Sequence, residues 1–372
     1  MSVTTDQGTG VVQASLSPAA RSPRSRSAFH QLVVSHVERL TDDSAALTFT
    51  VPAQLSDVFA FAPGQFLTIR RGDERRSYSI CAPAGAAPRI GVREVAGGAV
   101  SGWLVREVRP GDAIEVQAPG GSFTPDLSVP GHHVLLAAGS GITPMMSIAA
   151  SVLAADDQST VTLLYGNRRS GTVMFADEFA DLKDAYPARM HIVHVLSREP
   201  QEVELYSGRL NRERLAALLP VTVDIGSVDH WWLCGPYGMV TDATELLSAL
   251  GVDAGRVHRE LFWVGDEPPA EITHQDALEG DGATVTVTLD GRSSTFTLPA
   301  GMPILDGAQR IRPDLPFACK SGVCGTCRAK VTHGEAAMRR NYALEEQEVT
   351  SGYVLTCQAL PRTDDVAVDY DA

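Results

Sequence analysis

The sequence has no surplus of positive charge, few cysteines and no long apolar run. Its formal net charge is −14 over 372 residues, whereas a nucleic-acid-binding protein needs a basic face for the phosphate backbone. Six cysteines are too few for a disulfide scaffold in a chain of this length. No apolar stretch approaches the roughly eighteen residues of a membrane-spanning helix, and no secretory apolar region opens the chain. We therefore expect no nucleic-acid partner, no membrane span and a cytoplasmic, reducing location.

Composition divides the chain into segments. Residues 1–27 are small, polar and dotted with arginine, and their prolines oppose the amphipathic helix of a transit peptide, so we expect a disordered tail. Residues 263–282 contain six acids, two prolines and no lysine or arginine, which predicts a solvated acidic linker. The remaining sequence is long enough for three domains, over residues 28–130, 131–262 and 283–372.

Each predicted domain has its own pattern. Residues 28–130 alternate short apolar strands with turns rich in proline, glycine and aspartate, which predicts an antiparallel β-barrel with one short helix at VSGWLVREV. Residues 131–262 alternate apolar strands with amphipathic helices, which predicts a doubly wound α/β domain with a parallel sheet. Residues 283–372 begin with VTVTLDGRSSTFTL, a hairpin whose turn is indicated by Asp290-Gly291.

The last domain contains four cysteines in a characteristic spacing. Cys319, Cys324 and Cys327 lie in CKSGVCGTC as C-x4-C-x2-C, and Cys357 follows thirty positions later in GYVLTCQ, a stretch that we expect to be helix-like. This spacing is that of a plant-type [2Fe–2S] cluster, whose first three ligands lie in one loop. Structural zinc is the alternative, but it usually takes two C-x2-C pairs or histidines, and only His333 is near. The spacing predicts these four cysteines as the ligands of a [2Fe–2S] cluster.

The cysteine segment resembles a plant-type ferredoxin domain, which implies an α+β domain with a β-grasp fold. Lys320 stands where many such domains have arginine. We expect this difference to affect partner docking more than ligation of the cluster.

A second motif, LLAAGSGITP over residues 135–144, lies where a strand is expected to lead into a helix. The helix N-terminus there would attract a pyrophosphate through its free amides and its dipole. Pro144 occupies the place of the third glycine of the G-x-G-x-x-G fingerprint, so a simple tight turn explains the motif equally well when it is taken alone.

Five short motifs follow one another along the chain: RSYSI (76–80), GGAVSGWL (97–104), AGSGITP (138–144), CGP (234–236) and RELF (259–262). In this order they resemble those of ferredoxin–NADP reductase-like enzymes, from about His30 to Phe262. The resemblance implies that the chain binds FAD and a nicotinamide coenzyme.

The resemblance also assigns individual residues to FAD. Arg76 would pair with the pyrophosphate, Tyr78 would pack against the flavin and Ser79 would bond its N5 edge. The start of the short helix would meet the pyrophosphate. The residues assigned to FAD in this way are Arg76, Ser77, Tyr78, Ser79, Val92, Arg93, Glu94, Gly98, Val100 and Ser101.

The resemblance implies the nicotinamide site in the same way. The loop residues assigned to it are Gly139, Gly141, Thr143 and Pro144. The residues expected beside the nicotinamide ring are Cys234, Gly235 and Pro236. Taken alone, a cysteine that ends a strand is more often a small core residue. Glu260 and Phe262 match the E-x-F motif near the flavin, although the chain continues past the aromatic residue. Ser79, Cys234 and Glu260 are the residues predicted to be catalytic.

The choice of coenzyme depends on the loops after the second and third strands of the α/β domain. YGNRR, which includes Arg168, offers no acid for the ribose hydroxyl of NAD. Ser197-Arg198 matches the Ser-Arg pair that holds the 2′-phosphate in NADP-dependent relatives, and arginine suits a phosphate. The sequence therefore favours NADPH, while a solvated loop and NADH remain the alternative.

The order of the domains occurs in the reductase components of multicomponent oxygenases. The C-terminal run from NYALEEQEV onward, with RSYSIC and YGNR, is most similar to the phenylacetyl-CoA epoxidase reductase family. The resemblance implies electron flow from NADPH to FAD to the [2Fe–2S] cluster and on to a separate di-iron oxygenase. Consistently, the chain does not contain the two E-x-x-H pairs of a di-iron site. Two alternatives remain, an NADH-dependent reductase of a Rieske-type ring or steroid hydroxylase, and a redox-sensing binding module.

Overall fold

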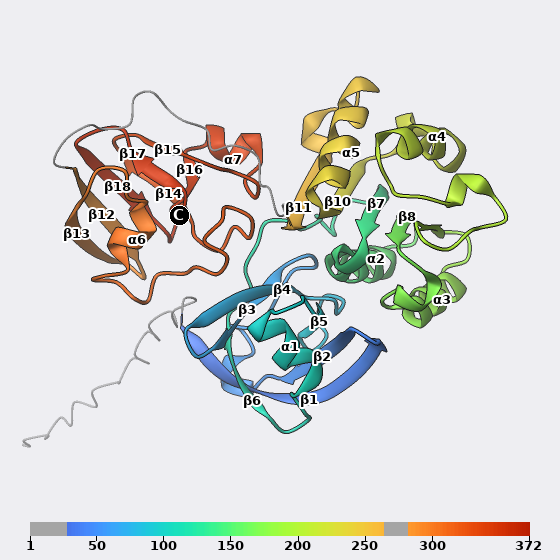
Figure 1. The fold of residues 1–372 in the computed structure, drawn as a ribbon, viewed down its shortest axis with the longest axis horizontal. Helices are drawn as coiled ribbons and strands as arrows, with labels where there is room; N and C mark the ends of the chain where they lie inside the picture. Colours follow the sequence, from blue (N-terminus) through green and yellow to red (C-terminus); the bar gives the residue numbers. More distant parts are fainter. Residues whose placement is uncertain (1–27, 264–281) are drawn as a thin grey trace, which may run out of the picture.

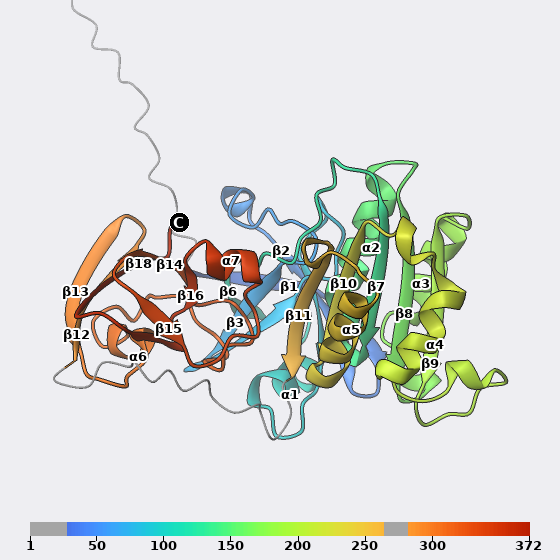
Figure 2. The same cartoon turned by 90° about the horizontal axis from the view of Figure 1, so that it is seen from above.

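The computed structural model describes residues 28–263 and 282–372 (Figure 1). The tail predicted over 1–27 and the interior of the predicted acidic linker, 264–281, lie outside the described residues. Figures 1 and 2 show three bodies, each built on its own sheet and each formed by one continuous part of the chain.

The first body is a six-stranded antiparallel sheet with the strand order β4-β3-β6-β1-β2-β5. An antiparallel bridge between Ile80 and Ile90 brings the two edges of this sheet together, which closes it into a barrel. Alternation buries Leu32 and Val34 completely, whereas Val33 between them is 45% exposed. The elements are β1 (Phe29–Thr41), β2 (Ser44–Thr50), β3 (Phe66–Arg71), β4 (Glu74–Ser79), β5 (Arg89–Arg93), α1 (Ala99–Arg106) and β6 (Ala113–Gln117).

The second body is a five-stranded parallel sheet with the order β11-β10-β7-β8-β9. Leu135 and Ala137 of β7 pack with α2 and α3 on one face, and Val134 and Leu136 pack with α4 and α5 on the other. Covered on both faces, the strands are continuous apolar runs. The elements are β7 (His132–Ala138), α2 (Ile142–Ala155), β8 (Thr160–Asn167), α3 (Ala176–Ala185), β9 (Met190–Leu196), α4 (Arg212–Thr222), β10 (His230–Pro236), α5 (Tyr237–Ala249) and β11 (Val257–Trp263).

The third body is a mixed sheet with the order β13-β12-β18-β14-β16, in which β12 and β18 pair in parallel. The predicted hairpin is confirmed, since Asp290 and Gly291 join β12 to β13 with φ angles of 54° and 67°, as a tight hairpin turn requires. The elements are β12 (Ala283–Leu289), β13 (Arg292–Leu298), α6 (Ile304–Ala308), β14 (Arg328–His333), β15 (Ala336–Met338), α7 (Glu346–Thr350), β16 (Tyr353–Leu355), β17 (Ala359–Pro361) and β18 (Asp365–Asp369).

The predicted fold class, a β-barrel followed by a doubly wound α/β domain and a β-grasp domain, is therefore confirmed. The helix-like interpretation of GYVLTCQ was wrong, because Tyr353–Leu355 form a strand paired with β14. Tyrosine and valine favour strands. In the part of the chain that the structure describes, no helix is long and apolar enough to cross a membrane.

Candidate active site

Three residues predicted to be catalytic meet where the barrel touches the parallel sheet. Ser79 ends β4, whereas Cys234 and Glu260 are directly paired neighbours on β10 and β11. The Ser79 Oγ donates a hydrogen bond to Glu260 Oε2 at 3.2 Å, and the Cys234 Sγ lies 4.0 Å from the same oxygen. Ser79 and Cys234 are buried and Glu260 is partly accessible. The fold thus joins residues that are 181 positions apart in sequence.

The electrostatics of this group favour neutral side chains. Burial raises the pKa of Glu260 to about 8, although the Ser79 hydroxyl partly opposes the shift. Burial, and then the adjacent Glu260 carboxylate, raises the pKa of Cys234 well above its usual value. The raised pKa values favour the protonated forms of Glu260 and Cys234, so that Glu260 can act as a proton donor and Cys234 is not a thiolate nucleophile.

The loop after β7 fits a dinucleotide because it carries little side-chain bulk. No side chain caps the N-terminus of α2, and the Ile142 amide donates to the backbone carbonyls of Gly139 and Ser140. The dipole of the helix favours an anion at this end. A Cβ on Gly141 would lie 2.2 Å from the carbonyl oxygen of Cys234, so only glycine lets this loop pack against the end of β10. Thr143 Oγ1 donates to the Ser140 carbonyl at 3.0 Å, and Pro144 is buried in the first turn of α2. Gly139 begins the loop with a φ of 57°.

The RSYS motif lies along β4. The Arg76 guanidinium is half-exposed, forms an ion pair with Glu74 at 2.7 Å and donates to the Arg75 carbonyl at 2.7 Å. A guanidinium has five N–H donors, so these contacts leave donors for a ligand. Tyr78 packs against the barrel core, and burial raises the pKa of its hydroxyl. The motif therefore presents one cation and one aromatic ring side by side at the barrel surface.

The short helix of the barrel begins with an uncapped N-terminus at Gly98. A Cβ on this glycine would lie 2.5 Å from the Ser101 Oγ, which accepts a hydrogen bond from the Val95 amide at 3.1 Å. Val100 is buried in the barrel core. The uncapped amides of α1 fit a pyrophosphate, as the resemblance implies.

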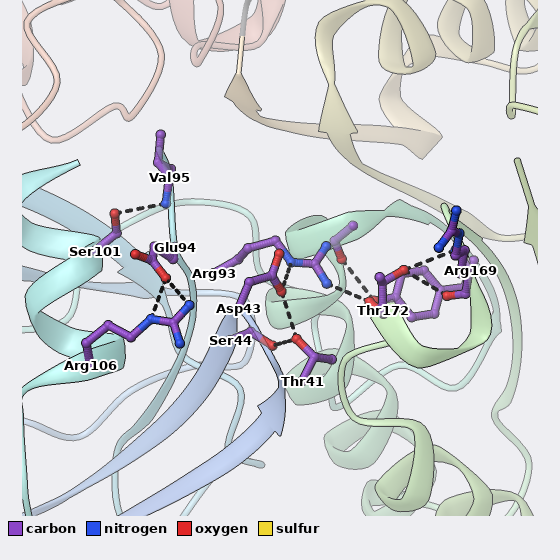
Figure 3. A network of polar contacts seen from close by, with 12 residues as sticks. Thr41, Asp43, Ser44, Arg93, Glu94, Val95, Ser101, Arg106, Arg169 and Thr172 are labelled. Atoms are coloured by element: carbon purple, nitrogen blue, oxygen red, sulfur yellow. Dashed lines mark hydrogen bonds and ion pairs between the residues drawn. The ribbon is translucent and has the colours of Figure 1, made fainter. Parts of the chain in front are cut away.

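Figure 3 shows that the side chains of Arg93 and Glu94 already have protein partners. Arg93 contacts Asp43 at 3.2 Å and donates to the Thr172 carbonyl at 2.5 Å, which joins the barrel to the parallel sheet. Glu94 accepts from Arg106 at 2.7 Å. Val92 is buried in the barrel core. Their assignment to FAD stays a prediction.

The residues predicted to choose the coenzyme lie at the carboxyl ends of β8 and β9. The Ser197 amide donates to the Asn167 carbonyl at 2.9 Å, and the Arg198 amide donates to the Arg168 carbonyl at 2.8 Å. Both arginine side chains are exposed. In parallel sheets, ligands bind outside this edge.

Sequence reasoning missed two residues at the same edge. Glu199 follows Arg198 directly, and its carboxylate accepts hydrogen bonds from the Ser170 amide at 2.9 Å and hydroxyl at 3.0 Å. Asn167 is 7% exposed, and within the described part of the chain its carboxamide has no hydrogen-bond partner. Asn167 lies within YGNRR and Glu199 directly follows Ser197-Arg198, so these two motifs were the available signal.

Gly235 and Pro236, the two remaining residues predicted at the nicotinamide site, and Phe262 of the E-x-F motif lie near the same site. Gly235, with a φ of 155°, and Pro236 end β10, and a Cβ on Gly235 would lie 2.9 Å from the Met239 Cε. Phe262 is partly buried against the core of the parallel sheet. The structure thus brings every predicted nicotinamide residue to one edge of the sheet.

The four cysteines stand as two thiol pairs. The Cys324 amide points at the Cys319 Sγ (3.4 Å) and the Cys319 amide at the Cys324 Sγ (3.5 Å). A hydrogen bond from the Cys324 thiol lowers the pKa of Cys319, and one from the Cys327 thiol lowers the pKa of Cys357. Among the described residues, no three histidine, cysteine or acidic side chains surround a single metal position.

Two pairs of thiols fit a binuclear cluster, in which each iron takes two cysteines, better than a tetrahedral zinc ion held by four ligands. The loop also turns its amides toward sulfur, since the Ser321 amide lies 3.4 Å from the Cys319 Sγ. Amides directed at sulfur stabilise a negatively charged cluster.

Three protein-family models match the chain. They describe an oxidoreductase FAD-binding domain over residues 31–124, an oxidoreductase NAD-binding domain over residues 135–245 and a 2Fe-2S iron-sulfur cluster binding domain over residues 287–362. Each model falls on one of the three bodies, and the third includes all four paired cysteines. The chain is thus an oxidoreductase of the flavin and iron–sulfur class.

Two curated relatives that match nearly the whole chain define the family, and a solved structure shares its fold. One subunit of the 1,2-phenylacetyl-CoA epoxidase of Escherichia coli K12 is 41% identical over 92% of this chain and 98% of its own length. The ferredoxin reductase component of the 3-ketosteroid-9-alpha-monooxygenase of Rhodococcus rhodochrous is 34% identical over 91% and 96%. The structure of phthalate dioxygenase reductase has a TM-score of 0.55 at 24% identity and covers 92% of this chain and 98% of that one. The chain belongs to the family that includes the matched subunit of the phenylacetyl-CoA epoxidase.

Proposed function

We propose that this chain is an NADPH-dependent reductase component that passes electrons through FAD and a [2Fe–2S] cluster to a separate di-iron oxygenase, the phenylacetyl-CoA epoxidase of phenylacetate degradation. The contact of Ser79 and Cys234 with Glu260 is the observation that supports it most, because it unites the flavin motif of the barrel with the nicotinamide motif of the parallel sheet. FAD supplies the step that accepts a hydride as two electrons and releases them singly.

Ser79, Cys234 and Glu260 position the groups that take part in this electron transfer. The Ser79 hydroxyl orients the Glu260 carboxyl, which holds a proton at neutral pH and can give it to a neighbouring group. Cys234 offers a compact, neutral sulfur beside it. Gly141 and Gly235 let the loop after β7 pack closely against the end of β10, since a Cβ on Gly141 would meet the Cys234 carbonyl and a Cβ on Gly235 would meet Met239.

NADPH is supported by the two exposed arginines, Arg168 and Arg198, whose amide–carbonyl bond holds them together at the edge where the adenosine end of a dinucleotide would lie. A guanidinium binds phosphate through its fork of donors. Glu199 is the feature that favours NADH, because an acid there can bond a ribose hydroxyl. Its carboxylate is engaged by Ser170, which supports the arginines as the selecting residues.

The proposed partner, the oxygenase of a phenylacetyl-CoA epoxidase, is inferred from the 41% identity to one subunit of that enzyme. The 34% identity to the ketosteroid monooxygenase reductase supports a second candidate, the reductase of a Rieske-type hydroxylase that uses NADH. Reconstitution separates the two. We expect the purified chain to support product formation from phenylacetyl-CoA with the oxygenase components of an epoxidase and NADPH, and not ketosteroid hydroxylation with a ketosteroid oxygenase and NADH.

The opposite pattern would replace the first candidate by the second. A chain that oxidises neither coenzyme in the presence of an artificial acceptor would instead support a redox-sensing module.

A further inference from the structure

Strand β4 contacts the ferredoxin domain through Arg75. The guanidinium lies between two rings, with its central carbon 4.0 Å from the ring centre of Phe317 and 5.1 Å from that of Phe29. The same group donates to the carbonyl oxygens of Leu315, at 3.3 Å, and Pro313, at 3.5 Å. Three of these four partners belong to the ferredoxin domain, so this side chain is directed mainly at the other body.

The next outward residue of β4 reaches the cysteine loop itself. The Ser77 Oγ lies 3.1 Å from the Thr326 Oγ1, and the Thr326 Oγ1 lies 3.1 Å from the Cys324 Sγ. A chain of short contacts therefore runs from the middle of the RSYS motif to one sulfur of the first thiol pair. Arg75 and Ser77 share a face of the strand because side chains alternate.

The parallel sheet holds the opposite flank of the ferredoxin domain. The rings of Tyr237 and Tyr342 meet edge to face with centres 5.8 Å apart, and the His258 Nδ1 lies 3.5 Å from the Glu345 Oε1. Val323, next to Cys324, packs with Tyr342 against the core of that sheet. The loop that carries Cys324 thus lies between two contact areas, and each contact area fixes it from one side.

We propose that Arg75 is a positioning residue that docks the ferredoxin domain on β4, and that the Ser77–Thr326–Cys324 contact is where electrons enter the cysteine loop. This inference rests on the proposed function. Each transfer step moves one electron, so the flavin side loses one electron and the cluster side gains one. Two such steps deliver the pair of electrons brought by one hydride.

Two variants test the docking and the entry point separately. Arg75→Ala removes the contacts to Phe317, Leu315 and Pro313, and Thr326→Val removes the hydroxyl that joins Ser77 to Cys324 while keeping the shape of the side chain. Arg39→Ala is the matched control, because Arg39 is an exposed arginine of the same barrel, on β1. Small-angle X-ray scattering of the full chain reports docking, and rapid mixing with NADPH reports the reduction of flavin and cluster separately.

We expect Arg75→Ala to increase the radius of gyration and to slow cluster reduction by about tenfold or more, because loss of docking lengthens the distance that each electron must cross. Flavin reduction should stay within about twofold, since Arg75 faces away from the nicotinamide motif. Thr326→Val should slow cluster reduction with an unchanged radius of gyration. Arg39→Ala should change neither measurement.

Unchanged scattering in Arg75→Ala would overturn its docking role, and unchanged cluster reduction in Thr326→Val would overturn the entry point. If Arg75→Ala does not fold, Phe317→Leu tests the same contact. Failure of NADPH and NADH to reduce the flavin of the unmodified chain would refute the proposed function instead, and the scattering result would still decide the docking contact.

Discussion

Replacing Glu260 by glutamine should remove a pH dependence from the folding stability of this protein. The pKa of Glu260 is raised from 4.5 to about 8 in the folded chain. A carboxyl whose folded pKa is raised stabilises the fold fully below its unfolded pKa, and this stabilisation is lost as pH rises through the folded pKa. Between pH 5 and pH 9 the wild-type chain should therefore lose up to about 4 kcal/mol relative to the glutamine variant.

That figure is an upper bound, because Glu260 is partly accessible and water screens its charge. Glutamine can still accept the Ser79 hydrogen bond but cannot ionise, so the two proteins should be about equally stable at pH 5. Urea unfolding at five pH values between 5 and 9 measures the difference. Glu245→Gln is the control, since Glu245 is an exposed acid paired with Arg212. Parallel wild-type and Glu260→Gln curves across this range would refute the raised pKa and, with it, the neutral carboxyl.

Three further predictions concern the cofactors and the coenzyme. Purified protein should contain one FAD and one [2Fe–2S] cluster per chain by analysis of flavin, iron and acid-labile sulfide, and zinc in place of iron would disprove the cluster. Cys324→Ser should lose the cluster and keep the flavin, so that NADPH-driven ferricyanide reduction survives while delivery to the oxygenase stops; undiminished oxygenase turnover would show that the cluster is not the relay. Arg198→Ala removes a charge-assisted hydrogen bond of about 1.5–3 kcal/mol, so kcat/KM for NADPH should fall about 10- to 150-fold, mainly through KM, while that for NADH barely changes. Equal losses for both coenzymes would assign Arg198 to the fold, and no loss for either would favour NADH.

Local patterns were enough to predict each body of the molecule. Alternation along residues 28–130 and the change to strand–helix rhythm after residue 131 depend on nearest-neighbour geometry, which a sequence displays directly. The cysteine spacing belongs to the same kind of information, because three ligands of one cluster lie within nine residues of chain. The helix-like interpretation of GYVLTCQ was wrong because short apolar runs have no distinctive period.

Contacts between bodies were not predictable in this way. The bond from Arg75 to Leu315 spans 240 positions and the Ser77–Thr326 contact spans 249. No periodicity marks such a pair, since it depends on how two folded surfaces fit together. The Ser79–Glu260 pair was expected only as two separate motif residues, and its hydrogen bond became visible once the barrel and the parallel sheet were placed together.

Strand β4 carries both the contacts to the ferredoxin domain and the residues of the predicted flavin motif. Arg75 and Ser77 contact the ferredoxin domain from one side of the pleat, and Arg76 and Tyr78 alternate with them on the other. Any ligand that binds Arg76 and Tyr78 more tightly in the docked form must, by reciprocity, strengthen docking by the same free energy. Such coupling does not require a path of intervening residues, because domain docking and ligand binding both involve the same four consecutive residues of β4.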